Sequence, residues 1–354
     1  MYERVIAEIA RRPLDGFLIT NPESVKWICN KTNDFWPAVI LVAQSRLHIF
    51  TKSRNLEAIR EIYPEHSFFP GGLEEVYATC KRLHLERIGI EANYVTMIDL
   101  DGLRSVLRGL EIVSVRDCIE DLRAIKTKEE IHLIQEAVLL SDRCYLEFLN
   151  HLRSGITEIE AKNIFRQIIF DRGAQDLSFD ILISSGSRTF LPHAVSTNKE
   201  ISHGDLVLMD FGVVLANYRS DTTRTVVMGE ADEMQMELYE IVLEAQTNAL
   251  GLLREGLTMS EADALARNTI LAKTDYGCYD SGLGHGIGRQ NHDPKPRMRP
   301  DDHHHVLKEN MVVTVEPGIY RRGWGGIRIE DILVVGKESP GQILTTCPKE
   351  FTVI

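Results

Sequence analysis

The chain repeats one short residue pattern, and this repeat restricts the folds open to it. Residues 153–161 read RSGITEIEA and residues 254–262 read REGLTMSEA, with Arg, Gly, Thr, Glu and Ala in matching positions. In each copy we expect a long helix to end at the Arg, the Gly to terminate it, and the Thr to cap a second helix together with the Glu. Strand-like hairpins follow each copy. The repeat therefore predicts a duplicated half-domain, with a site expected between its halves.

A boundary near residue 120 separates this duplicated part from a different N-terminal part. Thr127 and Glu130 form a T-x-x-E capping box, after which apolar residues recur at helical spacing as far as Arg153. Before the boundary, strand-like runs alternate with helix-like stretches, which is an α/β pattern. The runs are GFLIT (16–20), AVILVA (38–43), LHIFT (47–51), RIGIE (87–91) and LEIVSV (110–115). We predict an α/β (α+β) protein with domains at 1–120 and 121–354.

Charge and cysteine content limit the partners and the location. Forty basic residues against 52 acidic ones leave a net charge of −12, so no nucleic-acid partner is expected. The longest apolar run, AVILVA, is too short to span a membrane, and the N-terminus is charged rather than apolar like a secretion signal. The six cysteines form no C-x-x-C pair, which favours buried reduced thiols. These features predict a cytoplasmic protein without a membrane partner.

Two aspartates lie symmetrically about a predicted turn in the region that follows the first copy of the repeat. Asp210 follows the apolar run LVLM, and Asp221 lies equally far from the turn centre at Leu215–Ala216. Residues equidistant from the turn of an antiparallel hairpin face each other, and two like charges there are destabilising unless a cation lies between them. The alternative is a pair of exposed turn acids.

Two glutamates repeat this arrangement after the second copy. Glu316 and Glu330 are equidistant from Gly323, although Pro317 should interrupt strand pairing beside Glu316. Between the two hairpins, His285 stands in the Gly-rich stretch GLGHGIG, where backbone can approach the imidazole closely; a structural histidine is the alternative. Four carboxylates and one imidazole suit a pair of divalent cations, and a dinuclear site is a known device for hydrolysis.

Together, these motifs resemble the Xaa-Pro peptidases of the M24-type "pita-bread" superfamily, prolidase (Xaa-Pro dipeptidase) and aminopeptidase P. The resemblance covers nearly the whole chain and rests on the segments LPHA (191–194), GDLVLMDFG (204–212), YRSDTTRT (218–225), GLGHGIG (282–288), VEPGIY (315–320) and GIRIED (326–331). It implies a creatinase-like N-terminal α/β domain and a C-terminal pseudo-twofold pita-bread domain. One departure is HDPK at residues 292–295, where many members read H-E-x-P.

The resemblance also implies a residue-by-residue site. It makes five residues the ligands of two divalent metal ions: Asp210, Asp221, His285, Glu316 and Glu330. Mn²⁺ is the first expectation, with Co²⁺, Zn²⁺ or Fe²⁺ as alternatives, since all tolerate nitrogen and oxygen ligands. It implies four catalytic residues: the substrate-facing His193 and His292, the proton carrier Glu316, and the site arginine Arg328.

The function implied by this resemblance is that of a metallopeptidase. The expected reaction is hydrolysis of the bond between an N-terminal residue and proline, by a homodimer acting as an Xaa-Pro dipeptidase or aminopeptidase P on a peptide with proline at its second position. One alternative is a non-peptidase hydrolase or lyase of a small amide or zwitterion on the same fold. The intact set of five ligands counts against two others, a metal-free binding module and a purely structural domain.

Overall fold

A computed structural model describes residues 1–30 and 39–354, which form two compact units, Met1–Arg123 and Ala124–Ile354. Ala38, the first residue of the predicted strand AVILVA, lies outside the described residues. Both units combine helices with strands, so the predicted α/β fold class is confirmed. Within the described part of the chain, no helix is both long enough and apolar enough to cross a membrane.

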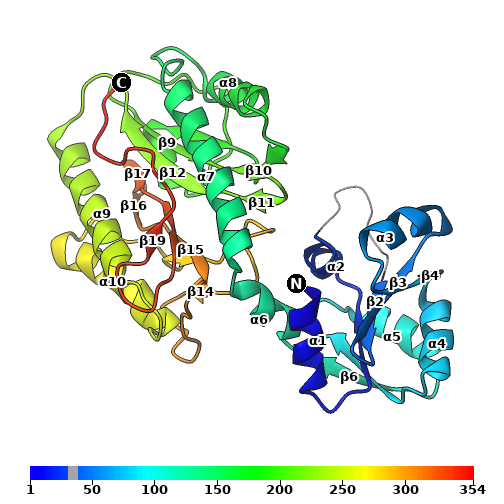
Figure 1. The fold of residues 1–354 in the computed structure, drawn as a ribbon. Coiled ribbons are helices and arrows are strands. Elements are labelled where there is room, and N and C mark those ends of the chain that lie inside the picture. Colours follow the sequence, from blue (N-terminus) through cyan, green and yellow to red (C-terminus); the bar gives the residue numbers. More distant parts are fainter. Residues whose placement is uncertain (31–38) are drawn as a thin grey trace. The chain divides into compact units, whose positions relative to one another are not determined.

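The first unit is built on a six-stranded sheet with the order β4-β3-β2-β1-β5-β6 (Figure 1). The strands are β1 (Gly16–Ile19), β2 (Val39–Ala43), β3 (Arg46–Thr51), β4 (Ser67–Pro70), β5 (Arg87–Glu91) and β6 (Glu111–Val115). β2 pairs antiparallel with β1 and β3, and the other pairs are parallel. β4 was not among the predicted strands, because SFFP is short and ends in a proline.

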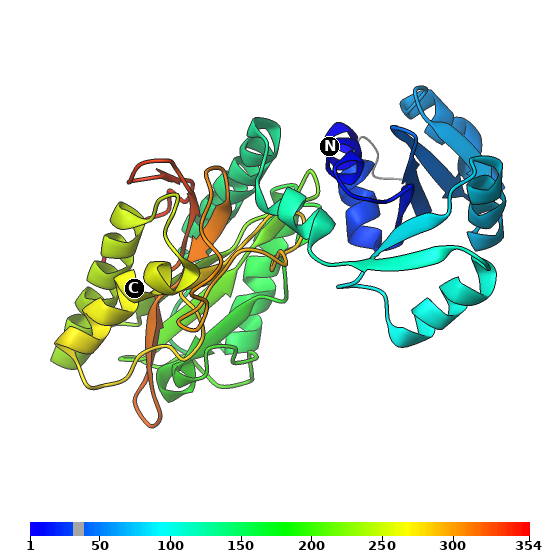
Figure 2. The same cartoon turned by 90° about the horizontal axis from the view of Figure 1, so that it is seen from below.

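Helices cover both faces of this sheet and so produce three layers (Figures 1 and 2). On one face, α1 (Tyr2–Ala10), α2 (Pro22–Ile28), α3 (Leu56–Ile62) and α6 (Cys118–Ala124) share a core with strand residues such as Phe17 and Ile49. On the other face, α4 (Leu73–Arg82) and α5 (Met97–Val106) pack on Leu18 and Phe50. Successive strand residues point to opposite faces, so a sheet covered on both sides needs the continuous apolar runs seen in the sequence. A short 3₁₀ helix, η1 (Ser53–Asn55), precedes α3.

In the second unit, the sequence repeat folds into two equivalent helix pairs. α7 (Lys128–Phe148) is followed by α8 (Glu158–Asp171), and α9 (Glu233–Leu252) by α10 (Met259–Lys273). Thr157 and Thr258 form the predicted capping boxes with Glu160 and Glu261. The glycines of the repeat have φ values of +85° and +89°, a left-handed conformation that favours glycine. The predicted duplication is therefore present in the structure.

The long helix before each copy ends earlier than predicted. α7 stops at Phe148 instead of Arg153, and α9 stops at Leu252. Near the end of α7, the side-chain amide of Asn150 donates hydrogen bonds to the carbonyls of Leu146 and Glu147. These contacts compete with backbone donors for the last helical carbonyls and so favour termination.

The strands of the second unit lie between the two helix pairs (Figure 1). The first hairpin comprises β9 (Leu206–Phe211), β10 (Val213–Leu215), β11 (Tyr218–Arg219) and β12 (Thr222–Val227), and the second comprises β15 (Val312–Val315), β16 (Gly318–Arg321), β17 (Gly325–Arg328) and β18 (Asp331–Val334). The remaining elements are β7 (Asp176–Leu177), β8 (Leu182–Ser185), η2 (Gly186–Phe190), β13 (Gly284–His285), β14 (Arg297–Met298) and β19 (Gln342–Ile343). One apolar core joins α7 and α8 to β9, and another joins α9 and α10 to β15 and β17.

Candidate metal centre

The first hairpin does not have the register expected from the sequence. Ala216 and Asn217 form its turn, with φ values of +48° and +65°, so the turn centre lies one residue later than Leu215–Ala216. Asp210 consequently pairs with Thr223 instead of Asp221. The predicted pairing was wrong because the two residues with positive φ are the central residues of the turn, and they lie one position later than predicted. A turn that is shifted by one residue changes the partner of every strand residue by two positions.

Asp221 nevertheless reaches the same place as Asp210, because the hairpin is irregular between its two strand segments. Gly212 separates β9 from β10, and Ser220 and Asp221 separate β11 from β12. A side chain on Gly212 would meet the carbonyl oxygen of Ser220 at 2.0 Å, so only glycine permits this close approach.

The second hairpin has the predicted symmetry. β16 and β17 pair Gly318 with Arg328, and β15 and β18 pair Val315 with Asp331, which centres the hairpin on Gly323. Glu316 and Glu330 lie in the break between these two ladders. The break occurs beside Pro317, as the sequence suggested, since proline has no N–H for the ladder.

His285 lies on β13, with glycines that let the neighbouring backbone close around it. A side chain on Gly284 would meet the carbonyl oxygen of Thr314 at 2.0 Å. Nδ1 of His285 lies 3.2 Å from the carbonyl oxygen of Gly286, and this contact favours the tautomer with the proton on Nδ1. Nε2 is then a lone-pair donor, and it lies 3.6 Å from Asp221 Oδ2 and 3.4 Å from Glu316 Oε1.

The potential ligand atoms converge in three overlapping groups, in each of which they lie within 4.8 Å of one another. The groups are Asp210–Asp221–Glu330, His285–Glu316–Glu330 and Asp221–His285–His292. All five residues expected as ligands are among them. His292, expected to face substrate, also comes within ligand range, and its ring centroid lies 3.9 Å from that of His285.

Two family models match the chain. Metallopeptidase family M24 matches residues 132–337, and the Creatinase/Prolidase N-terminal domain matches residues 1–125. The chain belongs to metallopeptidase family M24. It is therefore a metallopeptidase with a creatinase-type N-terminal domain and a pita-bread domain, as the motifs predicted, and membership of this family implies divalent metal ions.

Relatives of this M24 metallopeptidase match it over almost their full length. The Xaa-Pro dipeptidase of Pyrococcus furiosus is 38% identical over 350 residues, which is 99% of this chain and 98% of the relative. Among solved structures, an Xaa-Pro dipeptidase from Bacillus anthracis is 35% identical with a TM-score of 0.93, covering 100% of this chain and 99% of its own. An X-Pro aminopeptidase from Thermotoga maritima is 31% identical with a TM-score of 0.88, at the same coverage.

Residues that the sequence reasoning missed hold the acids of the metallopeptidase in place. The hydroxyl of Thr223 donates to Glu330 Oε2 at 2.7 Å, and that of Thr314 donates to Glu316 Oε1 at 3.0 Å. The amide of Asn291 donates to Asp221 Oδ2 at 3.0 Å. The sequence did contain a signal for the two threonines. Thr223 and Thr314 each stand two residues from a candidate ligand, and residues two apart on a strand share a face.

Arg328 is buried and contacts Asp210 directly. Its Nη2 donates to Asp210 Oδ2 at 2.6 Å, and its Nε donates to the Thr223 hydroxyl at 2.9 Å. Its Nη1 donates to the Tyr320 hydroxyl at 2.9 Å and to the carbonyl oxygen of Pro192 at 3.1 Å, which ties it to the loop that carries the exposed His193. A side chain with so many partners is held in one orientation, which in turn orients Asp210.

Burial raises the pKa of each of the four candidate carboxyl groups: Asp210, Asp221, Glu316 and Glu330. For Asp221 and Glu330, the charges of neighbouring carboxylates raise the pKa further. The positive charge of Arg328 opposes the rise in the pKa of Asp210 and Glu316. One guanidinium cannot balance four carboxylates, so the protein alone does not compensate the charge it buries here.

Burial favours the neutral form of the two histidines of the Gly-rich region. Burial lowers the pKa of His285 to about 4. Desolvation also lowers the pKa of the more exposed His292, and protonation of the neighbouring His285 would lower it further. Neutral imidazoles can bind a metal through one nitrogen or donate a hydrogen bond to substrate.

The residues fit the divalent ions that the family implies. Within the described residues, the buried atoms Oδ1 of Asp210 and Oε1 of Glu330 have no hydrogen-bond partner. Buried oxygens are seldom left unpaired, and these two belong to carboxylates whose neighbours are further acids. A cation would satisfy both oxygens and offset the repulsion that raises the pKa values.

Proposed function

We propose that this metallopeptidase hydrolyses the peptide bond between an N-terminal residue and proline, with two divalent metal ions. The proposed ligands are Asp210, Asp221, His285, Glu316 and Glu330. The observation that carries the proposal is the presence of more than one set of potential ligands, since Asp210–Asp221–Glu330 and His285–Glu316–Glu330 could each hold an ion. The names of the relatives from P. furiosus and B. anthracis support the Xaa-Pro substrate.

The set of oxygen ligands with one imidazole favours Mn²⁺ as the ion, with Co²⁺, Zn²⁺ and Fe²⁺ as alternatives. A cytoplasmic location and a homodimer stay predictions. Light scattering of the purified protein would test the oligomeric state.

Glu316 is the proposed proton carrier. When bound, divalent ions supply Lewis acidity and lower the pKa of water at the site. The carboxylate of Glu316 would accept the proton of the attacking water and return it to the leaving nitrogen. The proline nitrogen is tertiary in the substrate and must gain this proton as the bond breaks.

The other site residues would bind and orient. Neutral His292 would donate a hydrogen bond to the oxyanion that develops on the scissile carbonyl, and the exposed His193 would contact the substrate. Arg328 is proposed as a positioning residue for Asp210, because its guanidinium contacts that carboxylate and the loop before His193.

Substrate release tests the reaction. The Mn²⁺-loaded protein would be incubated with Ala-Pro, Ala-Pro-Ala and Ala-Ala, and the liberated amino acids measured. We expect release of alanine from a proline-containing substrate and much slower cleavage of Ala-Ala. Cleavage of Ala-Pro alone identifies a dipeptidase, and cleavage of the tripeptide identifies an aminopeptidase P. Cleavage of neither contradicts the proposal and favours a non-peptidase reaction.

Metal content tests the centre independently of substrate. Asp221→Asn removes a charge without changing the side chain's size, so it should abolish binding of at least one ion and lower kcat/KM by at least about a hundredfold. Asp301→Asn makes the same chemical change on an exposed loop residue and should leave both quantities unchanged. Elemental analysis that finds two ions in active Asp221→Asn protein would contradict the role of Asp221 as a ligand, and a single ion in the active parent protein would contradict the dinuclear centre.

A further inference from the structure

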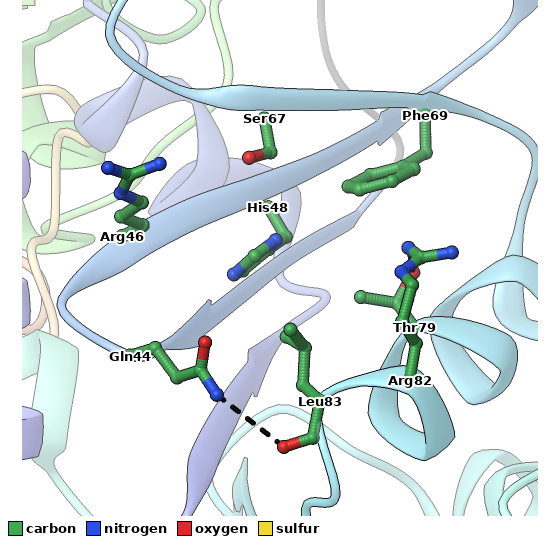
Figure 3. A pocket seen from close by; sticks show the side chains of 8 residues that line it. All are labelled: Gln44, Arg46, His48, Ser67, Phe69, Thr79, Arg82 and Leu83. Atoms are coloured by element: carbon green, nitrogen blue, oxygen red, sulfur yellow. Dashed lines mark hydrogen bonds between the residues drawn. The ribbon is translucent and has the colours of Figure 1, made fainter.

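The first unit contains a cavity of about 460 Å³, and none of the proposed catalytic or metal-binding residues lines it. Six residues that matter to its chemistry line it, as Figure 3 shows: Arg46, His48, Ser67, Phe69, Thr79 and Arg82. The volume is within the usual range of small-molecule sites, roughly 300–1,000 Å³.

The sheet register explains why these residues meet. β3 and β4 run parallel with His48 opposite Ser67, and β4 is an edge strand. Residues two apart on a strand share a face, so Arg46 joins His48 and Phe69 joins Ser67. α4 covers this face, and Thr79 and Arg82 are neighbours on it because they are three residues apart.

The end of α4 is also tied to the turn before β3. The amide of Gln44 donates to the carbonyl oxygen of Leu83 at 3.5 Å, as Figure 3 shows. The wall that carries Arg82 is thereby linked to the strand that carries Arg46, so the cavity is bounded by both backbone segments.

The cavity is positively charged and contains an unsatisfied imidazole. His48 is only 6% exposed, and within the described part of the chain its ring nitrogens form no hydrogen bond of good geometry, although a weak contact with the backbone of Ala43 opposes the fall in its pKa. Burial lowers the pKa of His48, and the charges of Arg82 and Arg46 lower it further. Two guanidinium groups thus disfavour the protonated form of one buried imidazole.

Acidic side chains do little to balance these charges. In the described part of the chain, Arg46 forms no ion pair, and Arg82 reaches Glu75 only at 4.0 Å. Arg82 otherwise donates to the Thr79 hydroxyl at 2.8 Å and lies 5.0 Å from the centroid of Phe69. Buried polar groups are normally well paired, so the poorly satisfied ring of His48 leaves at least one nitrogen able to hydrogen-bond a ligand in the cavity.

We propose that this cavity binds a small ligand with a phosphate head, either inorganic phosphate or a phosphate monoester. Arg46 and Arg82 would present guanidinium forks that match phosphate oxygens, and the hydroxyls of Ser67 and Thr79 would donate further hydrogen bonds. His48 would donate from the floor of the cavity. The ring of Phe69 offers an apolar surface for the organic part of a monoester.

Titration of the full-length protein with inorganic phosphate and with phenyl phosphate tests this site. Binding is followed by calorimetry and by the NMR signal of the His48 ring. The His48 signal reports on this cavity and not on the metal centre. We expect the His48 signal to shift with phenyl phosphate. An equal shift with inorganic phosphate would show that the head alone suffices, and no shift with either probe at millimolar concentration would overturn the proposal.

Arg46→Gln supplies the matched test, because this exposed side chain can be replaced without disturbing the core. It should weaken phenyl phosphate binding at the His48 signal about tenfold, the loss expected for a charge-assisted hydrogen bond. Arg60→Gln removes the same charge from an exposed position of α3 that does not line the cavity, and should bind like the parent protein. Equal affinity of the Arg46→Gln variant and the parent would overturn the assignment.

Discussion

Replacing Thr223 by valine tests whether the hydroxyl beside the metal centre orients its ligands. Valine has nearly the same shape but cannot form hydrogen bonds. The change removes the 2.7 Å contact to Glu330 Oε2 and the 2.9 Å contact from Arg328 Nε. Glu330 Oε1 has no hydrogen-bond partner, so the variant's carboxylate would lose the side-chain donor that fixes its orientation.

The size of the effect follows from the two contacts. Each involves a charged group, for which a hydrogen bond contributes about 1.5–3 kcal/mol. Loss of an outer partner of a metal ligand typically costs about 10–100-fold in metal affinity, or about 1.4–2.8 kcal/mol. We therefore expect Thr223→Val to bind Mn²⁺ about 10–100-fold more weakly in a competition titration against a chelator, and to regain part of its activity at high metal concentration.

The adjacent residue is the control. Thr222 is fully buried on the same strand, but its hydroxyl has no hydrogen-bond partner among residues 1–30 and 39–354. Thr222→Val therefore removes a buried group without breaking a contact and should be neutral or slightly stabilising. Metal affinity of Thr223→Val within twofold of the parent would refute the orienting role. Equal losses in both variants would instead point to a general disturbance of β12.

Three further changes test other parts of the structure. In the metal-free protein, stability should fall as pH rises above about 4, because carboxyl groups whose pKa is raised by folding stabilise the folded state only while they are protonated. Thermal unfolding at several pH values with and without EDTA measures this. A stability that does not change with pH in EDTA would contradict it. Arg224→Met breaks a buried 2.7 Å ion pair with Asp331 and should cost about 3 kcal/mol in urea unfolding, whereas a loss below 1 kcal/mol would show that the pair is dispensable. Gly288→Ala would place a methyl group 2.6 Å from Asp293 Oδ2 and should cost about 1–3 kcal/mol, while Gly251→Ala, in open space on α9, should be neutral or stabilising.

The sequence predicted the second hairpin better than the first for a physical reason. Around Gly323, the count of residues matches the actual ladder, so the symmetry of Glu316 and Glu330 was visible in the spacing. In the first hairpin, the register depends on positive φ values at Ala216 and Asn217, neither of which is a glycine. The sequence has no strong turn signal such as Asn-Gly at this position, so it did not predict where the turn lies. Asp221 then reaches its position through a break in the strands, which spacing alone does not predict.

Contacts that depend on tertiary packing were beyond sequence reasoning. The hydrogen bonds of Arg328 to Thr223 and Asp210 join segments about a hundred residues apart, and nothing local in either segment specifies them. The cavity beside His48 depends on β4, a short strand that the apolar pattern did not reveal. Helix caps, by contrast, are local, and the boxes at Thr157 and Thr258 formed where their residues predicted them.

The duplication of the second unit has a mechanical consequence. Asp210 and Asp221 come from the half with α7 and α8, whereas His285, Glu316 and Glu330 come from the half with α9 and α10. An ion bound by these residues would therefore cross-link the two halves, and without it the carboxylates of the two halves would repel each other. The affinity for metal should then depend on how stably the two halves are held together. A substitution far from the centre that loosens this joint should release metal before it disturbs any ligand.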